Sequence, residues 1–304
     1  MSSKLQPQVD RDVDTLLIEK KGRDYIGSTR SKSLINRMLI ASILGIVALM
    51  YILPFYWMII TALKPQEDLF KFPPTLIPET ITIENFLRVF EVVPLGRAYW
   101  NTFYTSVIIV ISQLIFCSVA GYVFEKIRFR FREFLFTVIL ITMIIPFQSE
   151  MVPMFLLMSD LRLVNTHAAL ILPAMITPFA IFFFRQNIKA IPNDLLDAAK
   201  IDGSGLLGRY WHVVVPNIKP AIGTITIFAF LGAWNNFLWP LIILNSRKMM
   251  LIEQVLAILG SAQTYEAEEA ARMAGATMAI IPILIVFFFS QRYFVRGIAL
   301  TGLK

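Results

Sequence analysis

The stretch that decides the fold runs from Ile191 to Pro220 and reads IPNDLLDAAKIDGSGLLGRYWHVVVPNIKP. It is the longest polar interruption in the C-terminal two-thirds of the chain, and long apolar segments lie on both sides of it. Pro192 suits the first turn of a helix, and Gly203 suits the left-handed turn that ends one. Pro216 and Pro220 then interrupt the chain again. The stretch therefore predicts a short helix, a glycine turn and a second short helix.

The first of these helices is amphipathic. At 100° per residue, Asp194, Asp197 and Lys200 share one face, while leucine and alanine side chains cover the other. Asp202 can hydrogen-bond the turn, and Ser204 can cap the second helix. Because the pair is too polar to cross a membrane and too apolar to stand alone in water, we expect it to present an apolar surface to another protein.

The rest of the chain has the composition of a polytopic membrane protein. Of its 304 residues, 57% are hydrophobic and only 16% are charged, and the mean hydropathy is +0.66. Six apolar segments are each near the roughly 20 residues that a bilayer requires. We expect an all-α fold with a polar N-terminal tail at residues 1–33 and a transmembrane domain at 34–304, with spans at 34–62, 98–123, 134–158, 168–187, 218–244 and 273–295.

The distribution of positive charge predicts the orientation. With the N-terminus inside, the inside regions carry 20 of the 28 Lys and Arg residues, and the outside regions carry the other eight. Positive residues concentrate in cytoplasmic loops, so an N-in, C-in topology is favoured. The same bias accounts for the net charge of +7. Nucleic-acid binding is not expected, because no soluble domain interleaves a basic patch with aromatic residues.

No catalytic or metal centre is predicted. Cys117 is the single cysteine, and His167 and His212 are far apart, so neither a ligand cluster nor a nucleophile–base pair can be drawn. The chain also lacks the glycine-rich phosphate loop that ends in Gly-Lys-Ser/Thr. No cofactor is therefore expected in this chain, and any ATP and Mg²⁺ would bind a partner.

The helix–turn–helix stretch resembles the "EAA" motif of ABC-importer permeases, which reads Glu-Ala-Ala, three residues, Gly, then an aromatic residue and two prolines four apart. Asp197 stands in the place of the glutamate, and Ser204 in the place of the usual alanine after the glycine. The residues that carry the resemblance are Asp197, Ala198, Ala199, Asp202, Gly203, Tyr210, Pro216 and Pro220.

Two further signatures resemble carbohydrate-uptake permeases of the maltose-transporter type, second subunit. They are WNNFLWPL at 234–241 and QRYFVRGIALTGLK at 291–304. The resemblance covers roughly residues 34–304. It implies a non-enzymatic subunit of an ATP-driven sugar importer in the plasma membrane of a prokaryote. The implied partners are an ATPase pair, a second permease subunit that completes the pathway, and an extracytoplasmic solute-binding protein.

The resemblance also implies roles for individual residues in the coupling of ATPase closure to alternating access. The helix pair would seat in a cleft of the ATPase subunit at the cytoplasmic face, where Asp197 would meet a basic group. Gly203 would set the angle between the two helices. Tyr210 would either fill an apolar notch or pack against the chain's own span five.

Polar groups inside spans are the candidates for the solute pathway. Gln148 and Glu150 lie in span three, and span five contributes Trp234, Asn235, Asn236 and Trp239. Aromatic faces and amides suit a sugar, which offers apolar C–H faces and hydroxyls. The alternative is structural, because Asn can join helices by hydrogen bonds and Trp often lies at the membrane interface.

Other classes of function remain open from the sequence. An ABC permease could carry another solute, such as glycerol-phosphate or an amino acid. An ion-coupled secondary transporter would need buried ionisable groups and internal repeats, and Glu150 is the only acidic candidate inside the predicted spans.

Overall fold

The computed structural model describes residues 36–69, 71–260 and 269–301, so the predicted tail at 1–33 lies outside the described residues. The chain divides into two units between Trp57 and Met58. The division falls inside the first long helix, Asn36–Ala62, which is apolar and long enough to cross a membrane. Each unit is therefore considered by itself, and the site lies wholly in the second.

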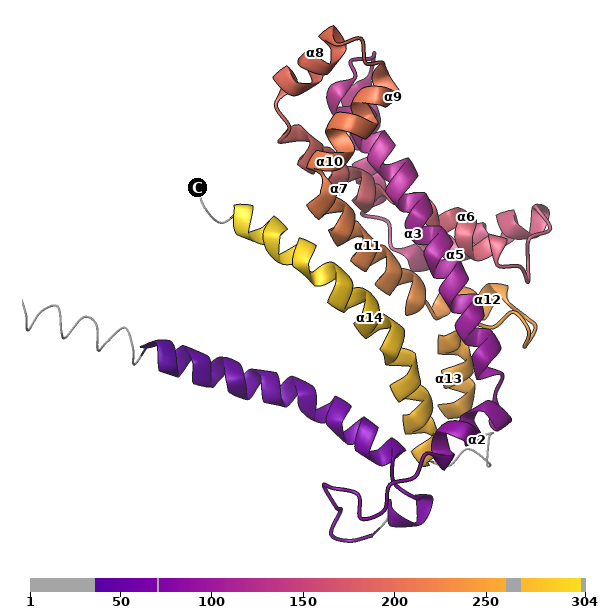
Figure 1. The fold of residues 1–304 in the computed structure, drawn as a ribbon. Coiled ribbons are helices and arrows are strands. Elements are labelled where there is room, and N and C mark those ends of the chain that lie inside the picture. Colours follow the sequence, from indigo (N-terminus) through magenta and orange to yellow (C-terminus); the bar gives the residue numbers. More distant parts are fainter. Residues whose placement is uncertain (1–35, 70, 261–268, 302–304) are drawn as a thin grey trace, which may run out of the picture. The chain divides into compact units, whose positions relative to one another are not determined.

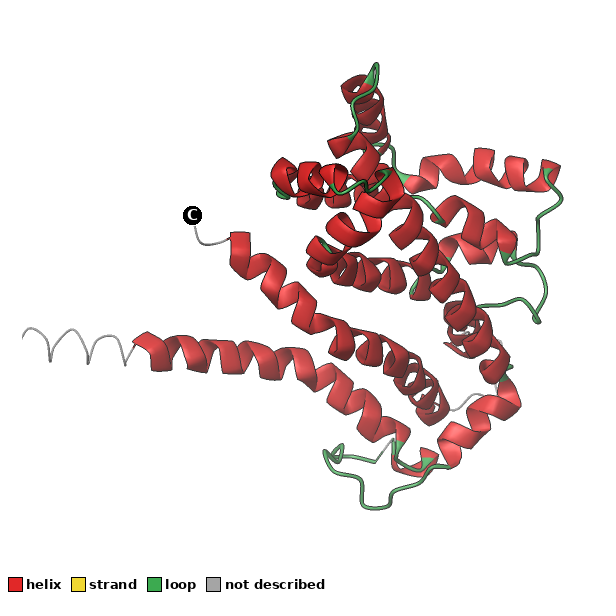
Figure 2. Cartoon of the chain, turned by 45° about the horizontal axis from the view of Figure 1, so that its top comes forward, coloured by secondary structure: helices red, strands yellow, loops and turns green. Residues whose placement is uncertain are grey.

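The second unit is built from helices (Figures 1 and 2), and no strand occurs in the described ranges. The prediction of an all-α membrane fold is confirmed. The helices after η1 (Gln66–Asp68) are α2 (Glu84–Val92), α3 (Leu95–Lys126), α4 (Arg132–Thr142), α5 (Phe147–Asp160), α6 (Ala168–Ala174), α7 (Pro178–Lys189), α8 (Asn193–Ile201), α9 (Leu206–Arg209), η2 (Tyr210–Val214), α10 (Val215–Asn217), α11 (Lys219–Trp234), α12 (Leu238–Ile243), α13 (Ile252–Gly260) and α14 (Glu269–Thr301).

The long helix α3 is the centre of this unit. It packs against α7 and α11, and α11 packs in turn against α14 (Figure 1). Buried apolar side chains form one cluster among α2, α3, α11, α13 and α14, and a second among α3, α4, α7, α8, η2 and α11. A third cluster joins α5, α6 and α12. Since α3 and α11 contribute to two clusters each, they connect the two ends of the unit.

Four described helices are long and apolar enough to span a membrane, or up to six if each of two bent pairs counts as one span. One bent pair is α4 and α5, which meet at 100° between Thr142 and Phe147. The sequence predicted one span at 134–158 here, whereas the structure has two helices with a sharp bend between them. Pro146 accounts for the difference, because it has no N–H to continue α4 and its own backbone is extended, with φ −65° and ψ 134°.

The predicted span at 218–244 is also interrupted. Helix α11 ends at Trp234, and α12 begins only at Leu238. The amides Asn235 and Asn236 lie in the break between them. The chain therefore presents polar side chains at the end of α11 instead of burying them within a continuous helix.

Proline inside a helix removes the N–H that would donate to the carbonyl four residues earlier. Pro173 lies within α6 and leaves the carbonyl of Ala169 without this donor. The indole Nε1 of Trp239 supplies the missing bond, at 2.9 Å from the Ala169 oxygen. The proline is therefore accommodated by a side chain from α12.

The same arrangement recurs in α14. Pro282 leaves the carbonyl of Met278 without its helical donor, and the hydroxyl of Tyr99 in α3 donates to it. The indole of Trp234 donates to the next carbonyl, that of Ala279, at 3.2 Å. The first bond replaces the donor that Pro282 lacks, and both bonds connect α14 to its neighbours.

Candidate coupling surface and solute pocket

The stretch at 191–220 forms the helix–turn–helix that its sequence predicts. Helix α8 ends at a turn where Gly203 has φ +82°, a conformation that costs glycine little and other residues more. The Gly203 N–H donates to the Lys200 carbonyl at 3.1 Å, and the Ser204 N–H donates to the Ala199 carbonyl at 2.9 Å. These bonds satisfy the last carbonyls of α8, as expected of a glycine C-cap.

The second helix differs from its prediction at both ends. Its N-cap is Gly205 with no side-chain cap, so Ser204 does not cap it. Pro216 does not end the helix either, because it lies inside α10 after the π-helical turn η2. A π turn widens the helix and gives the proline ring room that a regular turn lacks. The bend comes later, at Ile218, where the segment meets α11 at 80°.

One face of this pair is open. Asp197, Ala198, Asp202, Gly203 and Pro216 are exposed, and Ala199 is half-buried. Neither carboxylate forms an ion pair with any residue that the structure describes. The helix pair is thus accessible, and beside the carboxylates it exposes large apolar side chains such as Ile201 at 87% and Leu207 at 71%.

Tyr210 points the other way. Its side chain is buried, its hydroxyl lies 2.6 Å from the Ser118 hydroxyl in α3, and its ring lies 5.7 Å from that of Tyr122. Of the two roles that the resemblance implied, packing within the chain is the one observed. The contact is mainly with α3, although Ile218 and Ala221 at the start of span five belong to the same cluster.

An ion-pair cluster next to the helix pair was not anticipated from the sequence. Arg185 in α7 donates to Glu125 in α3 at 3.0 Å and to Glu133 in α4 at 2.8 Å. Its guanidinium also lies 3.9 Å from the centre of the Phe136 ring. Beside this cluster α3 and α7 touch at Gly121, where an added Cβ would lie 2.9 Å from the backbone nitrogen of Arg185. These contacts hold α3, α4 and α7 together at this end.

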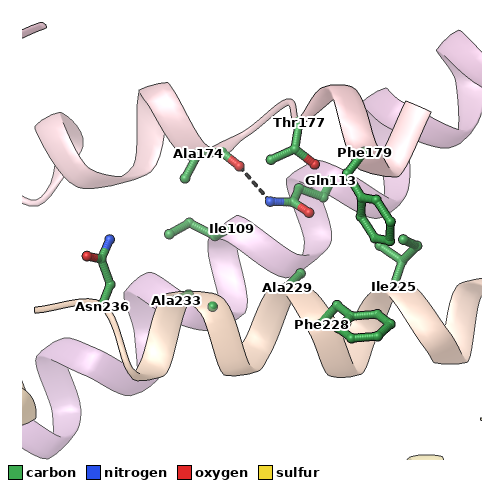
Figure 3. A pocket seen from close by; sticks show the side chains of 11 residues that line it. Ile109, Gln113, Ala174, Thr177, Phe179, Ile225, Phe228, Ala229, Ala233 and Asn236 are labelled. Atoms are coloured by element: carbon green, nitrogen blue, oxygen red, sulfur yellow. Dashed lines mark hydrogen bonds between the residues drawn. The ribbon is translucent and has the colours of Figure 1, made fainter. Parts of the chain in front are cut away.

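A pocket of about 300 Å³ lies deeper in the unit, between α3, the break from α6 to α7, and α11 (Figure 3). None of its lining residues is charged. They are Ile109, Gln113, Ala174, Thr177, Phe179, Ile225, Phe228, Ala229, Gly232, Ala233 and Asn236.

Proline chemistry places one of the amides in this pocket. Pro178 begins α7 and cannot donate to the Ala174 carbonyl, so the Gln113 Nε2 donates to it at 2.8 Å (Figure 3). Thr177 caps α7 by accepting from the Ala180 N–H at 3.3 Å. The amide oxygen of Gln113 accepts no hydrogen bond from the described residues. It is available to a hydroxyl donor in the pocket.

The remaining walls are amide and aromatic. Asn236 is half-buried, and its amide makes no hydrogen bond within the described part of the chain. Phe179 and Phe228 are 41% and 47% exposed as residues, and their rings meet edge to face with centroids 5.9 Å apart. The pocket therefore combines apolar ring surface with hydrogen-bonding amides, which is the chemistry expected for a sugar. Most of these residues are not the ones that the sequence predicted for the pathway.

The other predicted pathway residues lie elsewhere. Trp234 and Trp239 are almost completely buried and donate to the carbonyls of α14 and α6, so they join helices and offer no indole to a solute. Asn235 is exposed outside the pocket lining. Gln148 is exposed and Glu150 half-buried in the first turn of α5, and neither lines the pocket. Of the predicted set, Asn236 alone lines it.

The sequence missed Gln113, Phe179 and Phe228. Gln113 carried a usable signal, since an amide in the middle of an apolar helix needs a partner or a function. Phe179 and Phe228 carried none, because phenylalanine in an apolar segment is equally suited to lipid.

These features define a class: a helical membrane protein with an uncharged, amide-lined pocket between its spans and an exposed helix–turn–helix at one end. The family can also be stated. The chain belongs to the family of binding-protein-dependent transport system inner membrane components, whose model matches residues 113–300. The resemblance to ABC-importer permeases is thereby confirmed.

Relatives match over most of the chain. The arabinooligosaccharides transport system permease protein AraQ of Halalkalibacterium halodurans is 38% identical over 264 residues, which are 85% of this chain and 93% of that protein. The lactose transport system permease protein LacG of Rhizobium radiobacter is 37% identical over 256 residues, 84% and 92% of the two chains. The sn-glycerol-3-phosphate transport system permease protein UgpE of Brucella abortus is 29% identical over 271 residues, 85% and 94%.

A solved structure supports the same fold. A chain of a bacterial ABC transporter involved in the import of the acidic polysaccharide alginate superposes with a TM-score of 0.77 at 27% identity. The match covers 86% of this chain and 96% of that one.

Proposed function

We propose that this chain is a permease subunit of an ATP-driven importer of neutral sugars or oligosaccharides, and that the pocket in Figure 3 forms part of its solute pathway. The observation that carries the proposal is the pocket's lining. The amides of Gln113 and Asn236 can bond hydroxyls, while the rings of Phe179 and Phe228 can cover the apolar face of a pyranose. The relatives named for arabino-oligosaccharides and lactose support the same solute class.

The absence of charge from the lining weighs against the alternatives. A glycerol-phosphate permease would be expected to place Lys or Arg near the phosphate, and the relative named for that solute is less similar than the sugar permeases. An ion-coupled transporter would be expected to place an ionisable group near the solute. Neither kind of group lines this pocket.

We further propose that the open face of α8 and its turn receives the force from an ATPase subunit. The exposed carboxylates of Asp197 and Asp202 suit a basic groove, and the left-handed turn at Gly203 fixes how α8 is presented. In this reading the face is cytoplasmic, which agrees with the N-in, C-in distribution of positive charge. A second permease subunit and an extracytoplasmic solute-binding protein complete the transporter.

Reconstitution tests the transport proposal. The complete transporter is placed in vesicles with its binding protein, and uptake of labelled lactose and arabinotriose is measured with ATP inside. Uptake should require the ATPase pair and ATP. Uptake that continues on an ion gradient after the ATPase is omitted would contradict the proposal, as would faster uptake of glycerol-phosphate than of either sugar.

The coupling proposal is tested with a matched pair of variants. Asp197→Lys should reduce co-purification of the ATPase and its solute-stimulated hydrolysis, because the contact charge is reversed. Asp160→Lys makes the same charge reversal at an exposed position at the end of α5, outside the helix pair, and serves as the control. Equal behaviour of the two variants would remove Asp197 from the contact.

A further inference from the structure

A second cavity, of about 600 Å³, lies at the end of the unit that carries α8 and α9. It is enclosed by the end of α3, the loop that follows, α8 and α9. Its lining carries five cationic and two anionic side chains: Lys126, Arg128, Arg132, Lys200 and Arg209, with Glu125 and Asp197. Glu125 is already bound by Arg185 from outside the lining, so its charge is largely compensated.

Arg132 is bound by Glu133 at 2.8 Å. The other four cations form no ion pair with the described residues and share the lining with one unpaired carboxylate, that of Asp197. The Nε of Arg209 is buried and has no hydrogen-bond partner. Arg128 and Lys200 form no ion pair with the described residues, and Lys126 donates only to neutral oxygens, the Ile191 carbonyl and the Asn193 amide, at 2.7 and 2.9 Å. A buried donor without an acceptor is destabilising. The cavity is therefore complementary to an anion with several oxygens.

The position of the cavity relative to the bilayer indicates which anion it binds. Helix α3 has 32 residues and is about 48 Å long at 1.5 Å per residue, against a hydrocarbon thickness of about 30 Å. Because the helix is longer than the hydrocarbon and its last turn carries the charged residues Glu125 and Lys126, we place that turn outside the hydrocarbon. The loop that follows exposes Phe129 and Phe131, and the Arg130 guanidinium lies 4.8 Å from the Phe131 ring centre. Exposed aromatic and basic residues together are typical of the headgroup region.

We propose that this cavity binds the phosphate of an anionic phospholipid headgroup. The recognising chemistry is a phosphate oxyanion held by the Arg209 and Arg128 guanidinium groups and by Lys200. A free phosphate ester has the same chemistry, but the position of the loop in the headgroup region favours the lipid. The bound lipid joins α3 to the helix pair, and this role is independent of which solute is carried.

The test uses the complete transporter in nanodiscs of phosphatidylcholine with and without phosphatidylglycerol. Mass spectrometry counts the phosphatidylglycerol molecules retained per complex, and a photoreactive phosphatidylglycerol locates them. We expect retained lipid, with cross-links to peptides from residues 122–132 and 193–209. In Arg209→Gln the apparent affinity for phosphatidylglycerol should fall about tenfold, the change expected when one charge-assisted hydrogen bond is lost.

Two variants keep the outcome interpretable. Lys189→Gln removes an exposed cation that does not line the cavity and should retain the lipid. Arg209→Lys keeps the charge and should retain most of the binding even if Arg209→Gln folds poorly. The proposal is overturned if Arg209→Gln and Lys189→Gln retain the lipid equally. It is also overturned if millimolar inorganic phosphate displaces the lipid, or if the cavity variants release the ATPase while lipid binding is unchanged, which would assign the cavity to a soluble anion or a carboxylate of the partner.

Discussion

The indole of Trp239 donates to the Ala169 carbonyl at 2.9 Å, and Ala169 is the residue whose helical donor Pro173 removes. Trp239 in α12 and Pro173 in α6 therefore act as a pair. A tryptophan that the sequence suggested for solute binding instead compensates for a broken helix.

Removing this donor should destabilise the protein. Trp239→Phe leaves the Ala169 carbonyl buried without a partner, so the free energy of unfolding should fall by about 1–3 kcal/mol. Titration with SDS measures it, and Trp100→Phe, at a 64% exposed position, is the control. In the background Pro173→Ala, which restores a helical N–H, Trp239→Phe should cost clearly less. Equal costs in both backgrounds would separate the tryptophan from the proline.

Filling the solute pocket should stop transport without dissociating the complex. Gly232 lines the pocket, and an added Cβ there meets nothing within 4 Å. We expect Gly232→Leu to lower vesicle uptake of sugar more than tenfold, because its side chain occupies space that the solute needs. The control is Gly232→Ala, which adds one methyl group to a pocket of about 300 Å³ and should keep most of the uptake. Full activity of Gly232→Leu would place the pathway elsewhere.

The turn between α8 and α9 offers a matched glycine pair. Gly203 has φ +82°, whereas Gly205 has φ −68° and nothing within 4 Å of an added Cβ. Gly203→Ala should cost about 1–2 kcal/mol in conformational strain, and Gly205→Ala should cost less. We expect only the first to reduce ATPase co-purification, as measured by pull-down. A larger loss with Gly205→Ala would show that backbone strain does not set the presentation of α8.

The hydroxyl pair of Ser118 and Tyr210 should behave as one unit. Ser118→Ala leaves the buried Tyr210 hydroxyl without its partner and should cost about 1–3 kcal/mol. Tyr210→Phe should cost less, because the Ser118 hydroxyl still donates to the Leu114 carbonyl. The double variant should cost less than the two single costs added together, because the Tyr210 hydroxyl that Ser118→Ala leaves unpaired is then absent. Unfolding measurements on the four proteins check the cycle, and strict additivity would indicate that the pair does not interact.

The sequence predicted the parts of the fold that depend on local chemistry. Hydropathy located the apolar segments, and Gly203 marked the turn after α8. The breaks were harder, because a proline such as Pro146 predicts an interruption but not the 100° bend that packing produces. Pro216 shows the converse: the proline predicts a break, but the helix continues past it after a π-helical turn.

The site was less predictable for a related reason. Asn236 was found because an amide near a helix end stands out in an apolar run. Phe179 and Phe228 did not stand out in the sequence, since only the fold shows that their rings meet at a pocket. The sequence left two roles open for Trp234, because it does not show that the indole N–H donates to the Ala279 carbonyl.

Helix α3 contains both Ser118, which holds Tyr210, and Gln113, which lines the pocket. The two residues are five positions apart, about 7.5 Å along the axis. A regular helix is stiff over so short a length, so α3 can transmit a displacement along its axis. Movement of the helix–turn–helix would then shift the pocket wall by a similar distance, because no flexible segment lies between Ser118 and Gln113.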